Sequence, residues 1–446
     1  MSARRWTTAR APGLSALDGR IVRPVLGRPT RGWWLAVAGS GALTLVMLAG
    51  IAWTFAEGIG VWGNNTSVVW GFGIANYVWW IGIGNAGTLI SSMLLLTRQR
   101  WRASINRFAE SMTLFAAAIA GVFPIIHMGR PMFWYWLAPY PNTMSLWPQW
   151  RSPLVWDFWA ILSYILFSLI FWYVGLLPDL AVLRDRARGL RIRQVYGALA
   201  LGWLGSARQW RLHGKLHRTL AMLAVPLVCS VHSIVGLDFA ASLMPGWAET
   251  IFPPYFVVGA MFSGFCVVIV LAAVIRRALG LQSVITDAHF DVMARIVLAA
   301  ALIMGAAYAS EWFAAWYGGD PAEARFLRFI FLGPYQPLYV AMLALNVGLP
   351  QLLWLPRVRR DVGAVVLIAL LVNVGMWLER ILIILETLSH DYLPSSWRLF
   401  RPTLTDGAIL VGSLGLFALL FLILSRVAPL VSIHETGELV VTEAAA

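Results

Sequence analysis

The sequence predicts an all-α integral membrane protein with ten transmembrane helices. Hydrophobic residues make up 59% of its 446 residues and charged residues only 12%, and its mean hydropathy is +0.72. Ten apolar runs are each long enough to cross the roughly 30 Å of hydrocarbon in a bilayer. Basic residues gather in alternate connections between these runs. An even number of crossings predicts that both termini lie on one side of the membrane.

The predicted spans follow one another through most of the chain. They cover residues 33–56, 67–96, 107–129, 152–177, 217–244, 255–278, 289–316, 334–355, 362–388 and 406–426. The first and tenth contain almost nothing polar, which is typical of peripheral, lipid-facing helices. The middle eight are predicted to form two parallel four-helix bundles, because AAAIAG in the third span resembles AALIMG in the seventh. That alignment places His127 opposite Glu311.

The distribution of basic residues predicts the orientation. Of the 34 Lys and Arg residues, 26 lie on the side of the termini and six on the other. Excess basic charge stays cytoplasmic, so both termini are predicted in the cytoplasm and the protein in a bacterial cytoplasmic (inner) membrane. The net charge of +13 is therefore a topology signal and does not indicate nucleic-acid binding. Residues 1–32 form an Arg-rich cytoplasmic arm, expected to be weakly ordered against anionic lipid, and residues 427–446 form a short cytoplasmic tail.

The stretch from Gly121 to Asp157 carries the strongest functional pattern. His127 closes one span, Asp157 opens the next, and Arg130 and many aromatic residues lie between them. These polar groups are expected beside flat apolar walls at the membrane surface. The stretch therefore suits an amphipathic ring with two oxygens, because a histidine and a carboxylate can each accept a hydrogen bond from a hydroxyl group. The competing interpretation is structural, with His127 capping its helix and Asp157 favourable at a helix N-terminus.

Metal and haem centres are not expected in this chain. Cys229 and Cys266 lie in separate apolar runs and form no cluster, which excludes a self-contained iron-sulphur or zinc site. His127 and His232 are the histidines within membrane segments, and they differ in depth, whereas a b-type haem needs both axial ligands at one level.

Several long motifs resemble the membrane subunits of the polysulfide reductase family, often called NrfD-like or PsrC-like. They are GIANYVWWIGIGNAGTLISSM, FPIIHMGRPMFWYWLAPYPN, SPLVWDFWA, SVHSIVGLDFA and NVGMWLERILII. Within the family, the ten spans and these motifs are most similar to the quinol-oxidising membrane subunits of alternative complex III, such as ActC. The similarity covers about residues 33–425.

The resemblance implies a cofactor-free subunit that binds menaquinol or ubiquinol near the periplasmic face. By motif, His127 and Asp157 would be the quinol ligands, and Asn85 and Arg130 would be further quinone-binding residues. Asn85 stands where relatives carry His, so it could bond a quinone but not titrate. The implied partners are a periplasmic iron-sulphur subunit of ferredoxin-like or molybdopterin type, other membrane and cytochrome c subunits, and membrane lipids. On its own the chain would not be an enzyme.

A set of deep polar residues suggests a proton relay through the membrane. Each charge at mid-membrane costs roughly 2.5 to 3.5 kcal/mol on insertion scales, so these groups need pairing, neutralisation or a function. Arg380 is expected to neutralise a carboxylate on another helix. The alternative is a static polar network that holds the helices in register. The proposed relay comprises His232, Asp238, Tyr308, Glu311, Glu379, Arg380 and Glu386.

Other polar groups have a structural interpretation, and other functions are compatible with the sequence. The pairs Arg107 with Glu110 and Arg295 with Asp291 have helical spacing and are expected to be salt bridges near the cytoplasmic surface. A secondary transporter would use the deep polar residues to bind substrate. A non-catalytic anchor for a molybdopterin or iron-sulphur reductase would need neither His127 nor Asp157.

Overall fold

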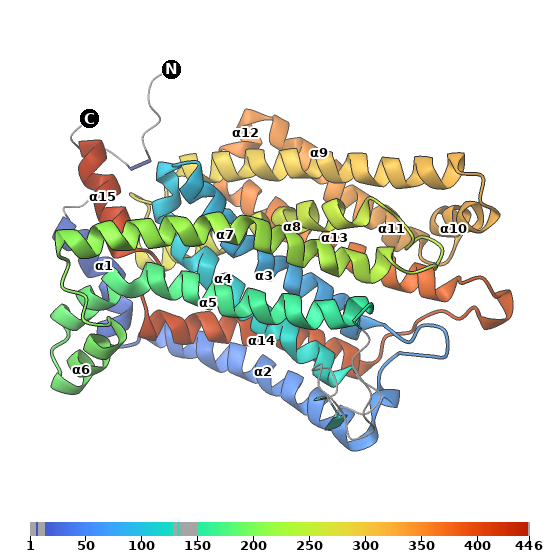
Figure 1. Cartoon of the computed structure of the whole chain (residues 1–446), viewed down its shortest axis with the longest axis horizontal. Coiled ribbons are helices and arrows are strands. Elements are labelled where there is room, and N and C mark those ends of the chain that lie inside the picture. The colour runs from blue at the N-terminus through green and yellow to red at the C-terminus, as the bar shows by residue number, and fades with distance from the viewer. Residues whose placement is uncertain (1–5, 8–13, 128–131, 134, 136–149, 445–446) are drawn as a thin grey trace.

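The computed structural model describes residues 6–7, 14–127, 132–133, 135 and 150–444. Over these residues the chain forms helices joined by turns and loops, with no β-strand. Ten helices are long and apolar enough to cross a membrane, which confirms the predicted fold class. The long helices run side by side in one elongated bundle, and short helices lie at its two ends (Figure 1).

The spans alternate in direction along the chain. They are α2 Arg31–Glu57, α3 Phe72–Leu96, α4 Asn106–Ile126, α5 Pro153–Arg186, α7 Ala207–Ala240, α8 Phe252–Leu279, α9 Asp287–Tyr317, α11 Gln336–Leu343 with its continuation to residue 354, α13 Val362–Ser389 and α14 Leu404–Val427. The shorter helices are α1 Leu14–Leu26, α6 Leu190–Leu199, α10 Pro321–Leu332, α12 Pro356–Arg359 and α15 Ile433–Ala444. The eighth span is broken: α11 passes into a π-helical turn, Ala344–Gly348, and then a 3-10 segment, Leu349–Trp354.

Both ends of the chain lie at the same end of the bundle, which is called the terminal end here; the opposite end is the distal end (Figure 1). The sequence predicted a weakly ordered arm and a polar tail at this end, and in part this prediction is wrong. Residues of α1 are packed, with Leu17 fully buried and Ile21 nearly so, and α15 is also helical. The backbone N–H groups of Trp6 and Thr7 donate to the Glu443 carboxylate of α15.

Two helices extend well past the apolar runs that predicted them. α5 and α7 each have 34 residues, about 51 Å at the rise of an α-helix. α7 begins ten residues before its predicted span, at a capping box in which Ser206 and Gln209 each bond the other's backbone. Hydropathy detects only the part of a helix that lies in hydrocarbon, whereas capping starts the helix in water.

Helix α3 lies at the centre of the bundle and packs against α4, α7, α8 and α13. Glycine allows two of these close contacts. A Cβ on Gly87 would lie 2.0 Å from the Ala109 carbonyl oxygen of α4, and a Cβ on Gly264 of α8 would lie 1.9 Å from the Ala86 Cβ. The glycines of this span therefore serve helix packing.

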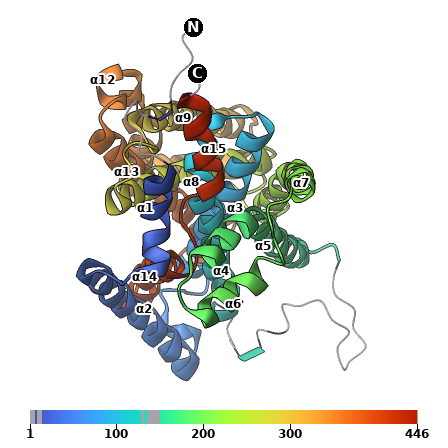
Figure 2. The same ribbon diagram turned by 90° about the vertical axis from the view of Figure 1, so that its left-hand side faces the viewer.

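Helices α2 and α14 pack chiefly on each other at one edge of the bundle (Figure 2). The contact is tight at Gly412, where a Cβ would lie 2.3 Å from the Met47 Cβ. The edge position agrees with the prediction that the first and tenth spans are peripheral. The other eight spans form the two bundles, α3–α4–α5–α7 and α8–α9–α11–α13, joined mainly where α3 and α7 meet α8.

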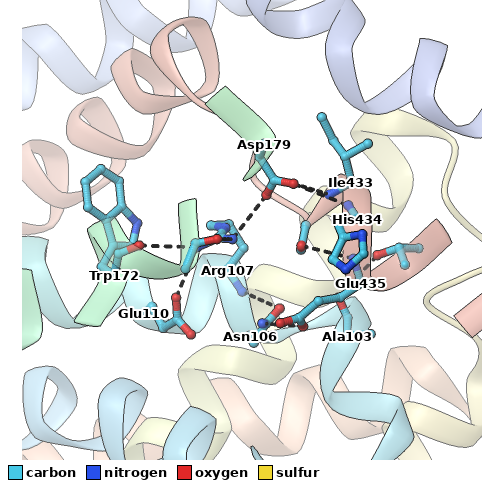
Figure 3. Close-up of polar contacts among 12 residues, drawn as sticks. Ala103, Asn106, Arg107, Glu110, Trp172, Asp179, Ile433, His434 and Glu435 are labelled. Carbon is cyan, nitrogen blue, oxygen red and sulfur yellow. Dashed lines mark hydrogen bonds and ion pairs between the residues drawn. The ribbon is translucent and has the colours of Figure 1, made fainter. Parts of the chain in front are cut away.

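A buried ion network joins the spans to α15 at the terminal end (Figure 3). Arg107 of α4 forms ion pairs with Glu110 at 3.3 Å and with Asp179 of α5 at 3.1 Å, and all three side chains are almost fully buried. The second oxygen of Asp179 accepts hydrogen bonds from the backbone N–H groups of Ile433 and His434. Asp179 thereby caps α15 from inside the bundle.

Glu435, in the first turn of α15, makes a second connection. Its carboxylate accepts from the Arg102 guanidinium at 2.6 Å and from the Asn106 amide at 2.7 Å. Thr436 donates to the Ala103 carbonyl oxygen. The expected pair of Asp291 with Arg295 is also present at 2.9 Å, and Arg359 binds the other oxygen of Asp291.

Candidate functional site

Two carboxylates and a tyrosine meet at the distal end of the first bundle. Tyr77, in the second turn of α3, donates a short hydrogen bond to Asp157 in the second turn of α5. Asp238, two residues before the end of α7, interacts electrostatically with both. One oxygen of each carboxylate is buried and has no hydrogen-bond partner within the described parts of the chain. These three residues are called the distal carboxylate group.

His127 lies beside the same stretch of α3. It follows the last residue of α4, and its backbone N–H donates to the Phe123 carbonyl oxygen. A Cβ on Gly73 would lie 3.0 Å from the His127 Cβ, and Gly73 is one helical turn from Tyr77. In its neutral form the imidazole can accept a proton from a ligand.

The structure does not bring every predicted site residue to this point. Asn85 lies eight residues beyond Tyr77 on α3, about 12 Å along the helix. Its amide nitrogen is 2.6 Å from the Nδ1 atom of His232 on α7, so the two form a pair of their own at mid-membrane. The amide oxygen of Asn85 and the Nε2 atom of His232 have no partner among the residues described. Arg130 lies outside the described residues.

A second group occupies the distal half of the other bundle. Tyr255, at the start of α8, donates a short hydrogen bond to Glu379 of α13. Arg380 is 3.5 Å from the same Glu379 oxygen, and its guanidinium lies over the Phe256 ring at 4.1 Å. The expectation that Arg380 pairs with a carboxylate on another helix is wrong. Its carboxylate is the preceding residue, because the α8 face opposite it is aromatic.

Four predicted relay residues line one small cavity in this bundle. Its volume is about 30 Å³, room for about two water molecules. Glu379 and Glu386 each have a buried oxygen without a partner in the described chain. The cavity is lined by Gly246, Tyr255, Tyr308, Glu311, Phe326, Ile330, Tyr339, Met342, Glu379, Leu382, Ile383, Glu386 and Thr387.

The cavity adjoins the broken eighth span. The Asn346 amide donates to the Tyr308 hydroxyl at 3.2 Å, and Asn346 lies in the π-helical turn. Pro350 follows this turn, and its lack of an N–H prevents a regular helical bond there. Single π-helical turns within α-helices are frequent at functional sites.

The two groups correspond only in part under the predicted internal repeat. Each bundle begins with a tyrosine that donates to a carboxylate, Tyr77 in the first and Tyr255 in the second. His232 and Asp238 near the end of α7 are six residues apart, as are Arg380 and Glu386 near the end of α13. The carboxylates that the two tyrosines bind are not equivalent, however, because Asp157 lies on α5, the third helix of its bundle, and Glu379 lies on α13, the fourth helix of its bundle.

Sequence reasoning missed three of these residues. Tyr77 and Tyr255 lie in aromatic runs, GIANYVWW and FPPYFVV, where a tyrosine is indistinguishable from packing. The signal that could have marked them is their position in the first or second turn of a helix, with Gly73 four residues before Tyr77 and two prolines directly before Tyr255. Asn346 had no such signal, because the break in its helix is visible only in three dimensions.

The comparisons with known proteins point to one family. The family model for polysulphide reductase, NrfD, matches residues 60–389. The chain is 28% identical over 281 residues to a membrane subunit ascribed to the dimethyl sulfoxide reductase of Halobacterium salinarum. The aligned part covers 61% of this chain and 55% of the relative.

A second relative is a selenate reductase subunit of Mesobacillus selenatarsenatis. It is 23% identical over 210 residues, which cover 45% of this chain and 47% of the relative. The chain therefore spans about half the length of the two relatives. The family match includes the tyrosine and carboxylates of both bundles, and the chain is a multi-pass membrane protein of the polysulphide reductase NrfD family.

Proposed function

We propose that this chain is the quinone-reactive membrane subunit of a multi-subunit oxidoreductase in the bacterial cytoplasmic membrane. It oxidises menaquinol or ubiquinol near the periplasmic face, at the distal carboxylate group and His127. The observation that carries this proposal is the pair of carboxylate oxygens, on Asp157 and Asp238, that have no partner in the described chain and lie at the same end of the bundle as His127. Unpartnered acceptors in a buried setting favour a ligand that donates hydrogen bonds.

The chemistry follows from what these groups can accept. Quinol oxidation removes two hydroxyl protons and two electrons. The neutral imidazole of His127 can take one proton, and the carboxylate of Asp157, oriented by Tyr77, can take the other. Asp238 gives the second proton a neighbouring acceptor on the way to water. Both protons would then leave at the distal end, which the distribution of basic residues predicts to be periplasmic.

The electrons need an acceptor on another chain. We infer an iron-sulphur subunit, of ferredoxin-like or molybdopterin type, docked at the distal end, with further membrane and cytochrome c subunits in the assembly. The names of the two relatives support membership of a reductase complex, since each is named as one subunit of a reductase.

The test is quinol-dependent reduction of the partner's clusters in purified complex. His127→Ala and Asp157→Asn are expected to lower that rate by at least about a hundredfold, because each removes a proton acceptor in the transition state. Glu57→Gln, an exposed carboxylate at the end of α2, is the control. A variant of His127 or Asp157 that assembles and turns over at the wild-type rate would favour the anchor interpretation.

We further propose that the deep groups of the second bundle carry protons. The small cavity, its unpartnered carboxylate oxygens and the amide and hydroxyl of Asn346 and Tyr308 support a hydrated path. The pair of Asn85 and His232 at mid-membrane would lie between the two bundles on this path. A secondary transporter could use the same cavity, but a volume of about 30 Å³ suits water better than a substrate.

A further inference from the structure

Helix α6 exposes an apolar face at the terminal end of the bundle. It connects α5 to α7, and in Figure 2, which looks along the spans from this end, it runs across the view. Ile192, Val195 and Leu199 fall on one face by helical spacing and are 49%, 56% and 39% exposed. The flanking Leu190, Leu201 and Leu204 are 71%, 69% and 80% exposed.

Arginines border this face on both sides. Arg191 and Arg193 lie on opposite sides of the apolar face, each about 100° from Ile192 on a helical wheel, and Arg188 lies just before α6. All three are exposed, and none of their side chains has a hydrogen-bond or ion-pair partner within the part of the chain that the structure describes. Arg193 interacts at longer range with Asp185, whose carboxylate is bound by the neighbouring Arg184. The three arginines and the exposed apolar face form what is called the α6 surface.

Two tyrosines fix the depth of this surface. The Tyr196 hydroxyl of α6 donates to the carbonyl oxygen of Val427, the last residue of α14. The Tyr173 hydroxyl of α5 donates to the carbonyl oxygen of Leu199, and Tyr173 lies about 27 Å along α5 from Val155. Since the hydrocarbon core is about 30 Å thick, α6 lies where hydrocarbon gives way to headgroups.

We propose that the α6 surface binds anionic phospholipid headgroups in the leaflet at the terminal end of the protein. An apolar face with arginines along its edges is the pattern of a helix that lies in the membrane interface. The apolar side chains enter the acyl region, and the guanidinium groups bond phosphate oxygens above them. Charge complementarity favours an anionic occupant, and the exposed apolar face between the arginines favours one that also offers acyl chains, as a phospholipid does.

The experiment uses the complex reconstituted in phosphatidylcholine vesicles that contain a trace of nitroxide-labelled lipid. Electron paramagnetic resonance measures the fraction of labelled lipid that the protein immobilises. Wild-type complex is expected to prefer labelled phosphatidylglycerol over labelled phosphatidylcholine several-fold. Replacing Arg188, Arg191 and Arg193 by Gln should lower this preference at least about threefold, and salt should lower the wild-type preference in the same direction.

The matched control replaces Arg100, Arg277 and Arg360 by Gln. These arginines are also exposed, and their side chains too have no hydrogen-bond or ion-pair partner among the residues that the structure describes, but they lie on other elements. The control should keep the wild-type preference. An unchanged preference in the α6 variant, or an equal loss in the control, would overturn the proposal.

Two further measurements separate other occupants of the surface. Inorganic phosphate at constant ionic strength should not release phosphatidylglycerol; if it does, the arginines form a simple anion site and the proposal fails. A nitroxide on Ile192→Cys should collide with oxygen dissolved in the bilayer. If it is shielded from both oxygen and a water-soluble relaxant, another subunit covers α6 and the lipid proposal is overturned.

Discussion

Tyr77 shows how one hydroxyl can organise a buried carboxylate. Its side chain is 5% exposed, and its hydrogen bond joins α3 to α5 at the distal end. Tyr77 binds one oxygen of Asp157 and thereby fixes the orientation of the carboxylate. The other oxygen has no partner in the described chain. A carboxylate fixed in this way is ready to accept from a ligand without reorganising.

The consequence can be tested with Tyr77→Phe. A hydrogen bond to a charged group is worth about 1.5 to 3 kcal/mol, and about 1.4 kcal/mol is a tenfold change in rate. We therefore expect kcat/KM for quinol to fall at least about tenfold while the complex still assembles. Steady-state kinetics with a soluble quinol analogue measures this change.

Tyr164→Phe is the matched control for that substitution. Tyr164 is also fully buried, but its hydroxyl donates to the Gly84 backbone carbonyl at 2.6 Å, away from the distal carboxylate group. Its loss should lower thermal stability and leave kcat/KM near the wild-type value. Equal kinetics in Tyr77→Phe and Tyr164→Phe would mean that Tyr77 only packs.

At the scale of elements, the sequence indicated which single polar residues lie in the membrane, but it did not indicate which residues surround them in the fold. The three deep glutamates stood out because an ionisable group in hydrocarbon is costly wherever it points, and Asp157 stood out because it follows an aromatic stretch at the membrane surface. Their grouping depends on which helices pack together, and no helical period reports that. Arg380 illustrates the limit: the charge on its own helix, Glu379, was nearer than any on another helix.

The number of spans could be predicted from the sequence, but the lengths of the helices could not. Ten apolar runs gave ten spans, because hydrocarbon thickness alone sets the minimum length. Helix ends depend on capping, as at Ser206, and on tertiary docking, as for α15, whose apolar residues are few. The segment 433–444 docks on the bundle because Asp179 accepts a hydrogen bond from its first backbone N–H group and Arg102 pairs with its Glu435.

Docking of α15 should depend on Glu435 and on pH. Burial raises the pKa of Glu435, but the charge of Arg102, followed by those of His217 and Arg107, lowers it further, and the net pKa lies below its usual 4.5. A carboxylate with a lowered folded-state pKa stabilises docking fully above its unfolded pKa and loses that contribution as pH falls through the folded value. Docking should therefore be intact at neutral pH and weaken only below about pH 4.5.

Fluorescence anisotropy of a dye on Thr442→Cys reports this docking. Glu435→Gln is expected to give the low anisotropy of a free helix already at pH 7. Glu438→Gln lies one turn further on, where the carboxylate is 71% exposed, and should behave as wild type. High anisotropy at pH 7 in Glu435→Gln would show that the apolar contacts of α15 suffice.

For the whole molecule, the orientation in the membrane rests on basic residues. Thr66 lies in the distal connection between α2 and α3, and Gly189 lies between α5 and α6 at the terminal end; both are exposed. Cysteine at Thr66 should react with a membrane-impermeant maleimide in intact cells, and cysteine at Gly189 only after lysis. Labelling of Gly189→Cys in intact cells would invert the orientation and move quinol oxidation to the cytoplasmic face.

Quinol oxidation is proposed for the first bundle and proton transfer for the second. Quinol protons taken up by the distal carboxylate group can leave at once at the same end, so quinol oxidation alone does not need the polar groups of the second bundle. Yet Glu311, Glu379 and Glu386 surround a cavity with room for about two waters. Packing alone would be served by serine or threonine at far lower cost.

Glu311→Gln and Glu386→Gln distinguish a relay from a static network. Both substitutions keep shape and most hydrogen bonds, so a static network predicts nearly silent variants, whereas a relay predicts fewer protons moved per electron. The measurement follows quinol turnover and the pH inside liposomes together, with Glu57→Gln as the control. Because neither glutamate belongs to the distal carboxylate group, quinol oxidation should persist in both variants, slowed or uncoupled. An unchanged ratio of protons to electrons would leave the second bundle with a structural role only, and quinol oxidation at Asp157 would stand without it.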